Sequence, residues 1–461
     1  MTRFEDLPLD LLPQILVHLV LPDHLAALCL VSRTFYSFSV PNLYRRIVIL
    51  PWHKSSKSRV TQLFRTLAEC PNLACLVHQL EIRDFPKRYG VSFSDEQSMD
   101  IYTKGLENCV HLKACTWTRD GSLTSEILSC LGRCPELTDI AINGGHSRHY
   151  QPMELVQLHH LRKISLIMPS IPVLMILSHW LQTIGRSLTS LSLVCKRDTS
   201  ITDTLLENIS HHLSQIEHLN LAGCPRVTNE GVWSIIRYNV KNIKELALEN
   251  LSPDFDMSAL GAACTNAGGL TSLRSFTSTI HRKGLTEAWI DATELLLKAS
   301  PIEVFQNYVP FPDSIGALAD TLCVRVVNQH RDHLVRFFSH RQCISLGTVE
   351  HVCVNCPRLE ELFIAIHYAE MAHLIPILAK ATRLRIVQIS PVGRPLAWDP
   401  LEYALDIVRQ CSPTISLVAI ETNAWKVERR VSIVEGIVQL NRFLTAVENP
   451  DIPERILVVH A

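Results

Sequence analysis

The residues from Ile216 to Val240 decide the fold, and they read IEHLNLAGCPRVTNEGVWSIIRYNV. Ile216, Leu219 and Leu221 follow the spacing L-x-x-L-x-L. Side chains alternate between the two faces of a strand, so Leu219 and Leu221 share one face. Gly223, Cys224 and Pro225 follow as a turn signal. The stretch therefore predicts a short strand with one apolar face, ending in a turn.

The second half of the same stretch predicts a helix. Thr228 or Asn229 can cap its first turn. The apolar residues that follow have the i, i+3, i+4, i+8 spacing of one helix face, and they are Val232, Ile235, Ile236 and Val240. Neither the strand nor the helix can bury its apolar face alone, so the unit requires copies of itself on both sides.

Such copies occur along most of the chain, with a period of about 25 to 30 residues. Including the first, there are roughly 13 units. Their apolar triplets, one of them weak at Leu270, are Val77, Leu80, Ile82; Leu112, Cys115, Trp117; Leu137, Ile140, Ile142; Leu161, Ile164, Leu166; Leu188, Leu191, Leu193; Ile243, Leu246, Leu248; Leu270, Leu273, Ser275; Ile302, Phe305, Asn307; Leu334, Phe337, Ser339; Leu359, Leu362, Ile364; Leu384, Val387, Ile389; and Ile415, Val418, Ile420.

The repeats predict an α/β solenoid with parallel strands inside and helices outside. Because a helix is wider than a strand, such a stack curves, and its strands line a concave face that is free to bind a partner. On the best-formed strands, alternation against the buried leucines points the following side chains into that face: His218, Asn220, Glu245, Ala247, Glu361 and Phe363. This mixture of neutral, acidic and aromatic groups suits a protein or peptide better than a nucleic acid.

A different pattern fills residues 7–47, which read LPLDLLPQILVHLVLPDHLAALCLVSRTFYSFSVPNLYRRI. Leu11, Leu12, Ile15, Leu16 and Leu19 form a wide apolar stripe on a first short helix. Further helices follow after the prolines, making four in roughly 40 residues. Such a small module cannot bury that much apolar surface by itself, so part of it should face a partner.

These N-terminal residues resemble an F-box, the motif that docks the Skp-type adaptor of SCF ubiquitin ligases. The matching positions include Leu7-Pro8, Asp23 and Val31-Ser32, whereas Phe35-Tyr36 stand where the family often has Trp. The resemblance implies adaptor contacts at Leu7, Pro8, Leu11, Leu12, Ile15, Leu16, Leu25, Leu28, Leu43 and Tyr44. Some of them must instead form the core of the module. The repeats resemble the cysteine-containing leucine-rich subtype often found in F-box proteins.

Together, these resemblances imply a substrate receptor that holds a Skp-type adaptor, and through it a cullin, while its concave face holds a client protein. Such a receptor carries no catalytic residues and no cofactor. The first alternative is an interaction scaffold whose helical N-terminus only caps the solenoid. The two hypotheses differ on Leu12 and Leu16: the scaffold predicts them buried inside the chain, and the F-box predicts them largely exposed without the adaptor.

The second alternative is an enzyme with a pocket near residues 280–322. That pocket would need convergent polar groups, but the segment offers only Glu287, Asp291, Glu294 and scattered neighbours. The sequence contains no Gly-rich phosphate loop, no G-x-S-x-G and no helical H-E-x-x-H. Cys353 and Cys356 form a C-x2-C pair, but no second pair follows at zinc-site spacing. We therefore predict no catalytic residues and no metal site.

The composition limits which binding partners and which cellular compartment are expected. Among 461 residues, 44 basic side chains balance 45 acidic ones, which argues against nucleic acid as a partner. The 15 cysteines lack the dense spacing of a disulfide framework, which favours a reducing cytoplasmic or nuclear compartment. The N-terminus lacks the order of a signal peptide, and no run of about 18 apolar residues predicts a membrane span.

The predicted domains are an F-box-like module at 1–50, a linker and capping helix at 51–72, the solenoid at 73–424 and a C-terminal cap at 425–461. Three stretches break the repeat and predict loops or insertions, at 83–105, 144–152 and 280–322. The cap is expected to be a last helix at 425–444, with a possible final strand at 456–459.

Overall fold

The computed structural model describes residues 9–19, 22–51, 53, 55–86, 96–145, 149–196, 199–280, 285–309, 317–393, 399–434 and 437–447. The chain forms two compact units, residues 1–189 and 190–461. The predicted adaptor contacts Leu7 and Pro8, and the predicted strand at 456–459, lie outside the described residues. The predicted domain boundaries at 50, 72 and 424 stay predictions.

The first unit begins with short helices and continues as alternating strands and helices. Its described elements are η2 (Leu9–Leu11), α1 (Leu12–Leu16), α2 (Pro22–Cys29), α3 (Arg33–Arg45), β1 (Arg46–Ile49), α4 (Ser56–Glu69), α5 (Pro71–Ala74), β2 (Gln79–Ile82), α6 (Glu96–Glu107), β3 (Ala114–Trp117), α7 (Ser125–Gly132), β4 (Asp139–Asn143), η4 (Pro152–Gln157), β5 (Lys163–Ile167) and α8 (Ile171–Ile184).

Strands β1 to β5 of the first unit pair in parallel and in register. The register aligns Leu80, Cys115, Ile140 and Ile164 on successive strands, and all four side chains are buried. These four residues occupy the same buried strand position in successive repeats. Strand β1 directly follows α3, so the helical N-terminus leads straight into the sheet.

The second unit repeats the same alternation and ends in two long strands. Its described elements are β6 (Ser190–Val194), α9 (Asp203–Ser210), β7 (His218–Ala222), α10 (Asn229–Ile236), β8 (Glu245–Glu249), α11 (Met257–Asn266), β9 (Ser275–Thr279), α12 (Glu287–Leu297), β10 (Val304–Tyr308), α13 (Ala317–His330), β11 (Arg336–Cys343), α14 (Leu346–Asn355), β12 (Glu361–His367), η6 (Tyr368–Glu370), α15 (Met371–Leu378), β13 (Ile386–Val392), α16 (Pro400–Gln410), β14 (Leu417–Ile420), β15 (Asn423–Val434) and β16 (Ile437–Ala446).

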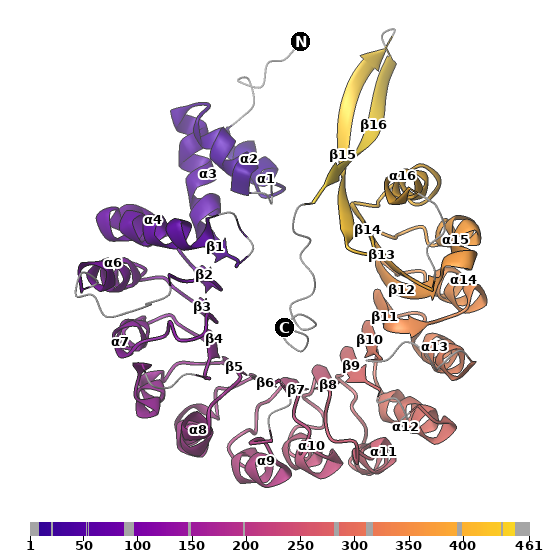
Figure 1. Cartoon of the computed structure of the whole chain (residues 1–461), viewed down its shortest axis with the longest axis horizontal. Coiled ribbons are helices and arrows are strands. Elements are labelled where there is room, and N and C mark those ends of the chain that lie inside the picture. The colour runs from indigo at the N-terminus through magenta and orange to yellow at the C-terminus, as the bar shows by residue number, and fades with distance from the viewer. Residues whose placement is uncertain are drawn as a thin grey trace. The chain divides into compact units, whose positions relative to one another are not determined.

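Strands β6 to β14 pair in parallel, and helices α9 to α16 lie along one side of them (Figure 1). We call the opposite side of these strands the strand face. One buried apolar residue per strand faces the helices in an unbroken row: Leu191, Leu219, Leu246, Phe276, Phe305, Phe337, Leu362, Val387 and Val418.

The predicted α/β repeat architecture is confirmed, and so is the predicted cap of one of its helices. Thr228 is the N-cap of α10, and its hydroxyl accepts a hydrogen bond from Glu230 N at 3.2 Å. One register was wrong. The weak unit was expected to place Leu273 and Ser275 on the strand, but β9 begins at Ser275 and its core residue is Phe276, because an aromatic ring fills the leucine position.

Two further predictions about elements were wrong. The stretch 83–105, expected to be a polar insertion, contains most of α6, whose Tyr102 and Leu106 are buried. The expected last helix at 425–444 is instead the antiparallel pair β15 and β16. Its alternating β-branched residues stabilise a strand rather than a helix. No helix in the described parts of the chain has the length and apolar character needed to cross a bilayer.

Candidate functional site

Residues 9–45, which we call the helical module, pack around a small core. Helices α1 and α2 both lie against α3. The buried side chains are Leu12, Leu16, Leu25, Ser39 and Val40. Ser32 fixes the start of α3, since its hydroxyl accepts a hydrogen bond from Phe35 N at 3.2 Å. A sharp turn between α2 and α3 thus presents the residues just before Ser32 to the surface.

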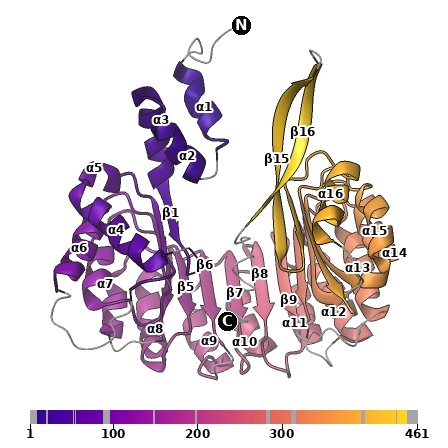
Figure 2. The same cartoon turned by 45° about the horizontal axis from the view of Figure 1, so that its top comes forward.

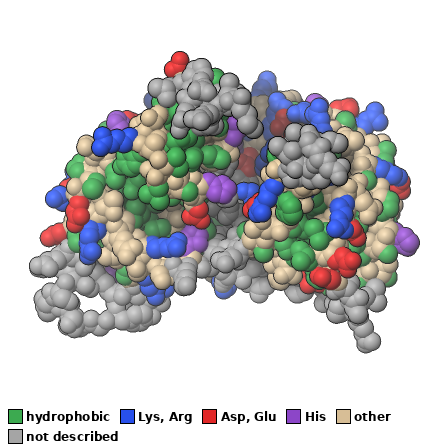
Figure 3. All heavy atoms as spheres, turned by 90° about the horizontal axis from the view of Figure 1, so that it is seen from above, with side chains coloured by type: hydrophobic (Ala, Val, Ile, Leu, Met, Phe, Trp, Pro, Cys, Tyr) green, Lys and Arg blue, Asp and Glu red, His purple; other side chains and the backbone are tan. Residues whose placement is uncertain are grey.

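Among the described residues of the module, six large apolar side chains face outward, and we call them the exposed apolar set. Their exposed fractions are Leu11 38%, Ile15 39%, Val17 65%, Leu30 89%, Val31 63% and Tyr36 49%. Figure 3 shows hydrophobic side chains gathered on the surface over the helical module. Single exposed apolar residues are ordinary, but so many within one small module are unusual for a surface that stays in contact with water.

The expectation that Leu12 and Leu16 are largely exposed was wrong. Leu12 is 4% exposed and Leu16 is 2% exposed. These residues are four apart, so they share the side of α1 that packs on α3. Leu11 and Ile15, each one residue earlier, lie on the other side and are exposed. The stripe in the sequence is therefore divided between a core side and a surface side.

The other predicted adaptor contacts divide in the same way. Leu25 is buried, whereas Leu28, Leu43 and Tyr44 are half-buried. Burial raises the pKa of the Tyr44 hydroxyl above its usual value. Four exposed apolar residues were not among the predicted contacts: Val17, Leu30, Val31 and Tyr36. The position of Leu30 in the sequence could have indicated its exposure. Leu30 follows the last residue of α2, so the helical spacing no longer predicts that its side chain is buried.

The predicted client residues lie on the strand face of the second unit, opposite the buried leucines. His218 Nδ1 lies 2.9 Å from Glu245 Oε2 on the next strand. Asn220 Nδ2 donates to Ser192 Oγ at 2.9 Å. Arg336 Nε lies 3.1 Å from Glu361 Oε1. The face is therefore lined by polar cross-strand pairs, one of which, Arg336 with Glu361, joins opposite charges.

Two of the six predicted client residues are not free to bind. Ala247 is fully buried, and Phe363 is 6% exposed. The Phe363 ring stacks on that of Phe338 with centroids 4.2 Å apart, and His340 meets it edge-on at 5.7 Å. Burial, and secondly Arg341, lowers the pKa of His340 to about 4. A neutral His340 thus completes an aromatic cluster that the sequence pattern did not reveal.

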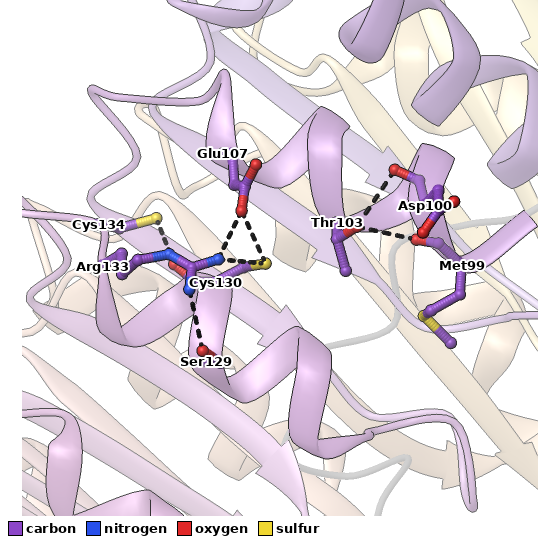
Figure 4. Close-up of polar contacts among 8 residues, drawn as sticks. All are labelled: Met99, Asp100, Thr103, Glu107, Ser129, Cys130, Arg133 and Cys134. Carbon is purple, nitrogen blue, oxygen red and sulfur yellow. Dashed lines mark hydrogen bonds and ion pairs between the residues drawn. The ribbon is translucent and has the colours of Figure 1, made fainter. Parts of the chain in front are cut away.

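The clearest polar cluster of the first unit lies on its helices. Arg133 Nη2 contacts Glu107 Oε1 at 2.5 Å and Cys130 Sγ at 3.3 Å (Figure 4). These residues line a cavity of about 520 Å³. Burial raises the pKa of the Cys130 thiol, which opposes formation of the reactive thiolate. Since Arg133 already pairs with Glu107, this cluster has the features of a structural contact rather than of a nucleophile.

The acidic residues considered for an enzyme do not converge on a cavity. Asp291 and Glu294 on α12 both pair with Arg325 of α13 on the surface. These contacts join two neighbouring helices. In the described part of the chain, no group of three or more His, Cys, Asp or Glu residues has a geometry that could hold a metal ion.

The family comparison matches the N-terminal part of the chain. The F-box-like family model matches residues 4–50. A comparison with curated proteins found no match. Among solved structures, a chain in the crystal structure of the Rad7 and Elc1 complex in yeast is similar, with a TM-score of 0.44 and 14% identity over 76% of this chain and 92% of that one.

The matched residues 4–50 include the whole helical module and strand β1. The family model therefore covers the exposed apolar set and also the buried core of the module. The repeats that follow are an α/β solenoid by their own strand pairing and burial. The chain thus carries an F-box-like domain at residues 4–50, joined directly to an α/β repeat array.

Proposed function

We propose that this protein is the substrate-recognition subunit of an SCF-type ubiquitin ligase. Its F-box-like domain docks a Skp-type adaptor, and through it a cullin, while the strand face of the repeat array holds a client protein. The chain transfers nothing itself. It raises the effective concentration of client lysines near the charged ubiquitin-conjugating enzyme.

The observation that carries this proposal is the exposed apolar set of the F-box-like domain. Leu30 is 89% exposed and Val31 is 63% exposed in a turn whose geometry is fixed by the Ser32 cap. An ordered apolar turn that stays exposed is the form of a preorganised protein-binding surface. Its position within residues 4–50 supports a Skp-type adaptor as the partner.

The scaffold alternative keeps one observation in its favour, since it predicted that Leu12 and Leu16 are buried. That burial alone does not distinguish the hypotheses, because the module uses those two leucines for its own core and exposes Leu11 and Ile15 instead. A mere cap would need no outward apolar side chains at all. The exposed residues, rather than the buried ones, therefore support adaptor docking.

The test is co-purification of the full chain with a Skp-type adaptor. We expect the wild type to bind. A Leu30→Asp, Val31→Asp double variant should bind at least about tenfold more weakly, because it places charges in an apolar interface. Met175→Asp is the matched control, since Met175 is 78% exposed on α8 outside the module. If folded wild type does not bind the adaptor, the ligase function is abandoned.

A further inference from the structure

The strands β15 and β16 form a two-stranded ribbon that extends beyond the end of β14. β15 pairs with β14 only over the stretch from Asn423 to Lys426, but it pairs with β16 as far as Val434 (Figure 2). Beyond Lys426 the described residues provide only these two strands. An isolated two-stranded ribbon is marginally stable in water, so a third strand would stabilise it.

No strand of the described residues pairs with the outer edge of β16. β16 is the last strand in the sheet order of the described residues. Val447 N donates to Ala424 O at 2.8 Å, so odd-numbered residues of this strand point their amides toward β15. The outward amides then belong to Val438, Leu440, Arg442, Leu444 and Ala446. The strand contains one charged residue and no proline, so it lacks the usual protection of an edge strand.

Two arginines beside this edge form no ion pair with an acidic side chain of the described residues. Arg429 and Arg442 lie directly opposite each other on the same face of the ribbon. Arg429 Nη2 donates to the carbonyl oxygens of Pro413 and Ile415, at 2.8 and 3.2 Å. Arg442 Nη1 is buried, and no hydrogen-bond partner for it is found among the described residues. Like charges placed opposite each other destabilise a strand pair, so this arrangement favours an added anion.

The opposite face of the ribbon offers apolar surface. Phe443 is 44% exposed, and the Arg430 guanidinium lies 5.2 Å from the centre of its ring. Arg430 also forms an ion pair with Glu428 on this face, with 3.2 Å between the charged atoms. Residues 423–447 contain four basic and two acidic side chains, which gives the ribbon a positive charge.

From these features, we propose that the β15–β16 ribbon docks an extended, acidic segment of a partner protein. The segment adds a third strand along β16 and places a carboxylate on the Arg429 and Arg442 pair, with apolar side chains beside Phe443. A second copy of this chain is a poorer occupant because it would bring further arginines of the same sign. This interaction is separate from adaptor docking and does not depend on it.

The test measures peptide binding to the full chain by fluorescence anisotropy. The probe is an end-blocked, labelled peptide of alternating valine and glutamate, as long as the ten residues of β16. Replacing each glutamate by glutamine removes the charge, and replacing a central valine by proline prevents the strand ladder. We expect the glutamate peptide to bind about tenfold more tightly than either control peptide.

Three variants distinguish the contribution of the strand edge from that of the charge. Leu444→Pro removes an outward amide and keeps both arginines, so it should weaken binding about tenfold, whereas Leu444→Ala, which keeps the amide, should weaken it less. Arg442→Gln should abolish the preference for glutamate over glutamine. Circular dichroism checks that each variant is folded, and the proline-containing peptide tests the ladder independently of any variant.

Three outcomes would overturn this inference. The first is equal binding of the glutamate and glutamine peptides. The second is a dimer without peptide, seen by sedimentation velocity, that Leu444→Pro converts to a monomer, since the occupant would then be a second copy. The third is binding only after residues 448–461 are removed, since the chain's own C-terminal residues would then compete for this edge.

Discussion

The side chain of Asn239 joins two neighbouring repeats of the second unit. Its Nδ2 donates to Leu213 O at 2.5 Å, and its Oδ1 accepts from Ile216 N at 3.1 Å. Asn239 is 1% exposed, so both bonds are shielded from water. Leu213 and Ile216 lie between α9 and β7, whereas Asn239 follows α10. One side chain therefore fixes the turn of the preceding repeat.

Replacing this amide should destabilise the second unit. Asn239→Ala leaves a buried carbonyl and a buried amide without partners, which costs about 2–4 kcal/mol of the free energy of unfolding. Urea unfolding followed by circular dichroism measures the loss. Asn242→Ala is the control because Asn242 is exposed on the same turn, and its unfolding midpoint should match that of the wild type.

Replacing either of two helix glycines by alanine should change the free energy of unfolding differently. A Cβ on Gly231 of α10 would lie 3.0 Å from Asp203 Cα and collide with Asp203 Oδ1, which accepts the amide of Thr228 at 2.8 Å. We expect Gly231→Ala to lower the free energy of unfolding by about 1–3 kcal/mol.

Gly347 of α14 is the matched control. A Cβ there would meet only Ser345 Oγ at 3.8 Å. Gly347→Ala should leave the free energy of unfolding unchanged or raise it by up to about 1 kcal/mol, because alanine favours the helix. The same urea experiment measures both variants, and an equal loss in both would refute the close contact at Gly231.

The stability of the second unit should fall on mild acidification. His330 is 2% exposed, and burial followed by His333 lowers its pKa to about 4. In the unfolded chain the pKa is about 6.5. The unfolded state therefore binds the proton first, and the stabilisation present above pH 6.5 is lost as the pH falls toward 4.

His330→Gln removes this titrating group. Urea midpoints measured at pH 7 and pH 5 should differ less in this variant than in the wild type. His373→Gln, at an exposed position of α15, provides the control and should keep the wild-type difference. If His330→Gln leaves the pH dependence unchanged, His330 is not buried as a neutral group.

Truncations in the helical module should separate its core from its surface. Leu16→Ala opens a cavity beside α3 and should cost about 2–4 kcal/mol of stability. Leu30→Ala, at an exposed position, should change stability by less than about 0.5 kcal/mol but weaken adaptor binding. Thermal unfolding and a binding titration on both variants check the distinction. Equal effects of the two truncations on stability would contradict it.

The sequence predicted the repeated strands and helices because each needs its neighbour to bury an apolar face. The rows through Leu219 and Leu362 followed directly from the spacing. The ribbon was mistaken for a helix because its valines also fit a helical spacing. The alternation of Trp425 and Val427 and the Glu435-Gly436 turn signal favoured strands instead.

The candidate site was less predictable. Residues four apart share one side of a helix, but nothing in the spacing states which side meets α3. Leu12 and Leu11 therefore looked equivalent, although one is buried and the other exposed. Phe363 was assigned to the strand face correctly, but its burial depends on Phe338, which lies 25 residues earlier on another strand.

Hydrogen–deuterium exchange of the full chain, with and without a Skp-type adaptor, tests the central claim most directly. We predict slower exchange at residues 11–36 when the adaptor is added, because the exposed apolar set becomes covered. We predict no change at residues 218–222 and 245–249, which belong to strands β7 and β8. Unchanged exchange in the helical module, or protection confined to the strand face, would contradict the account.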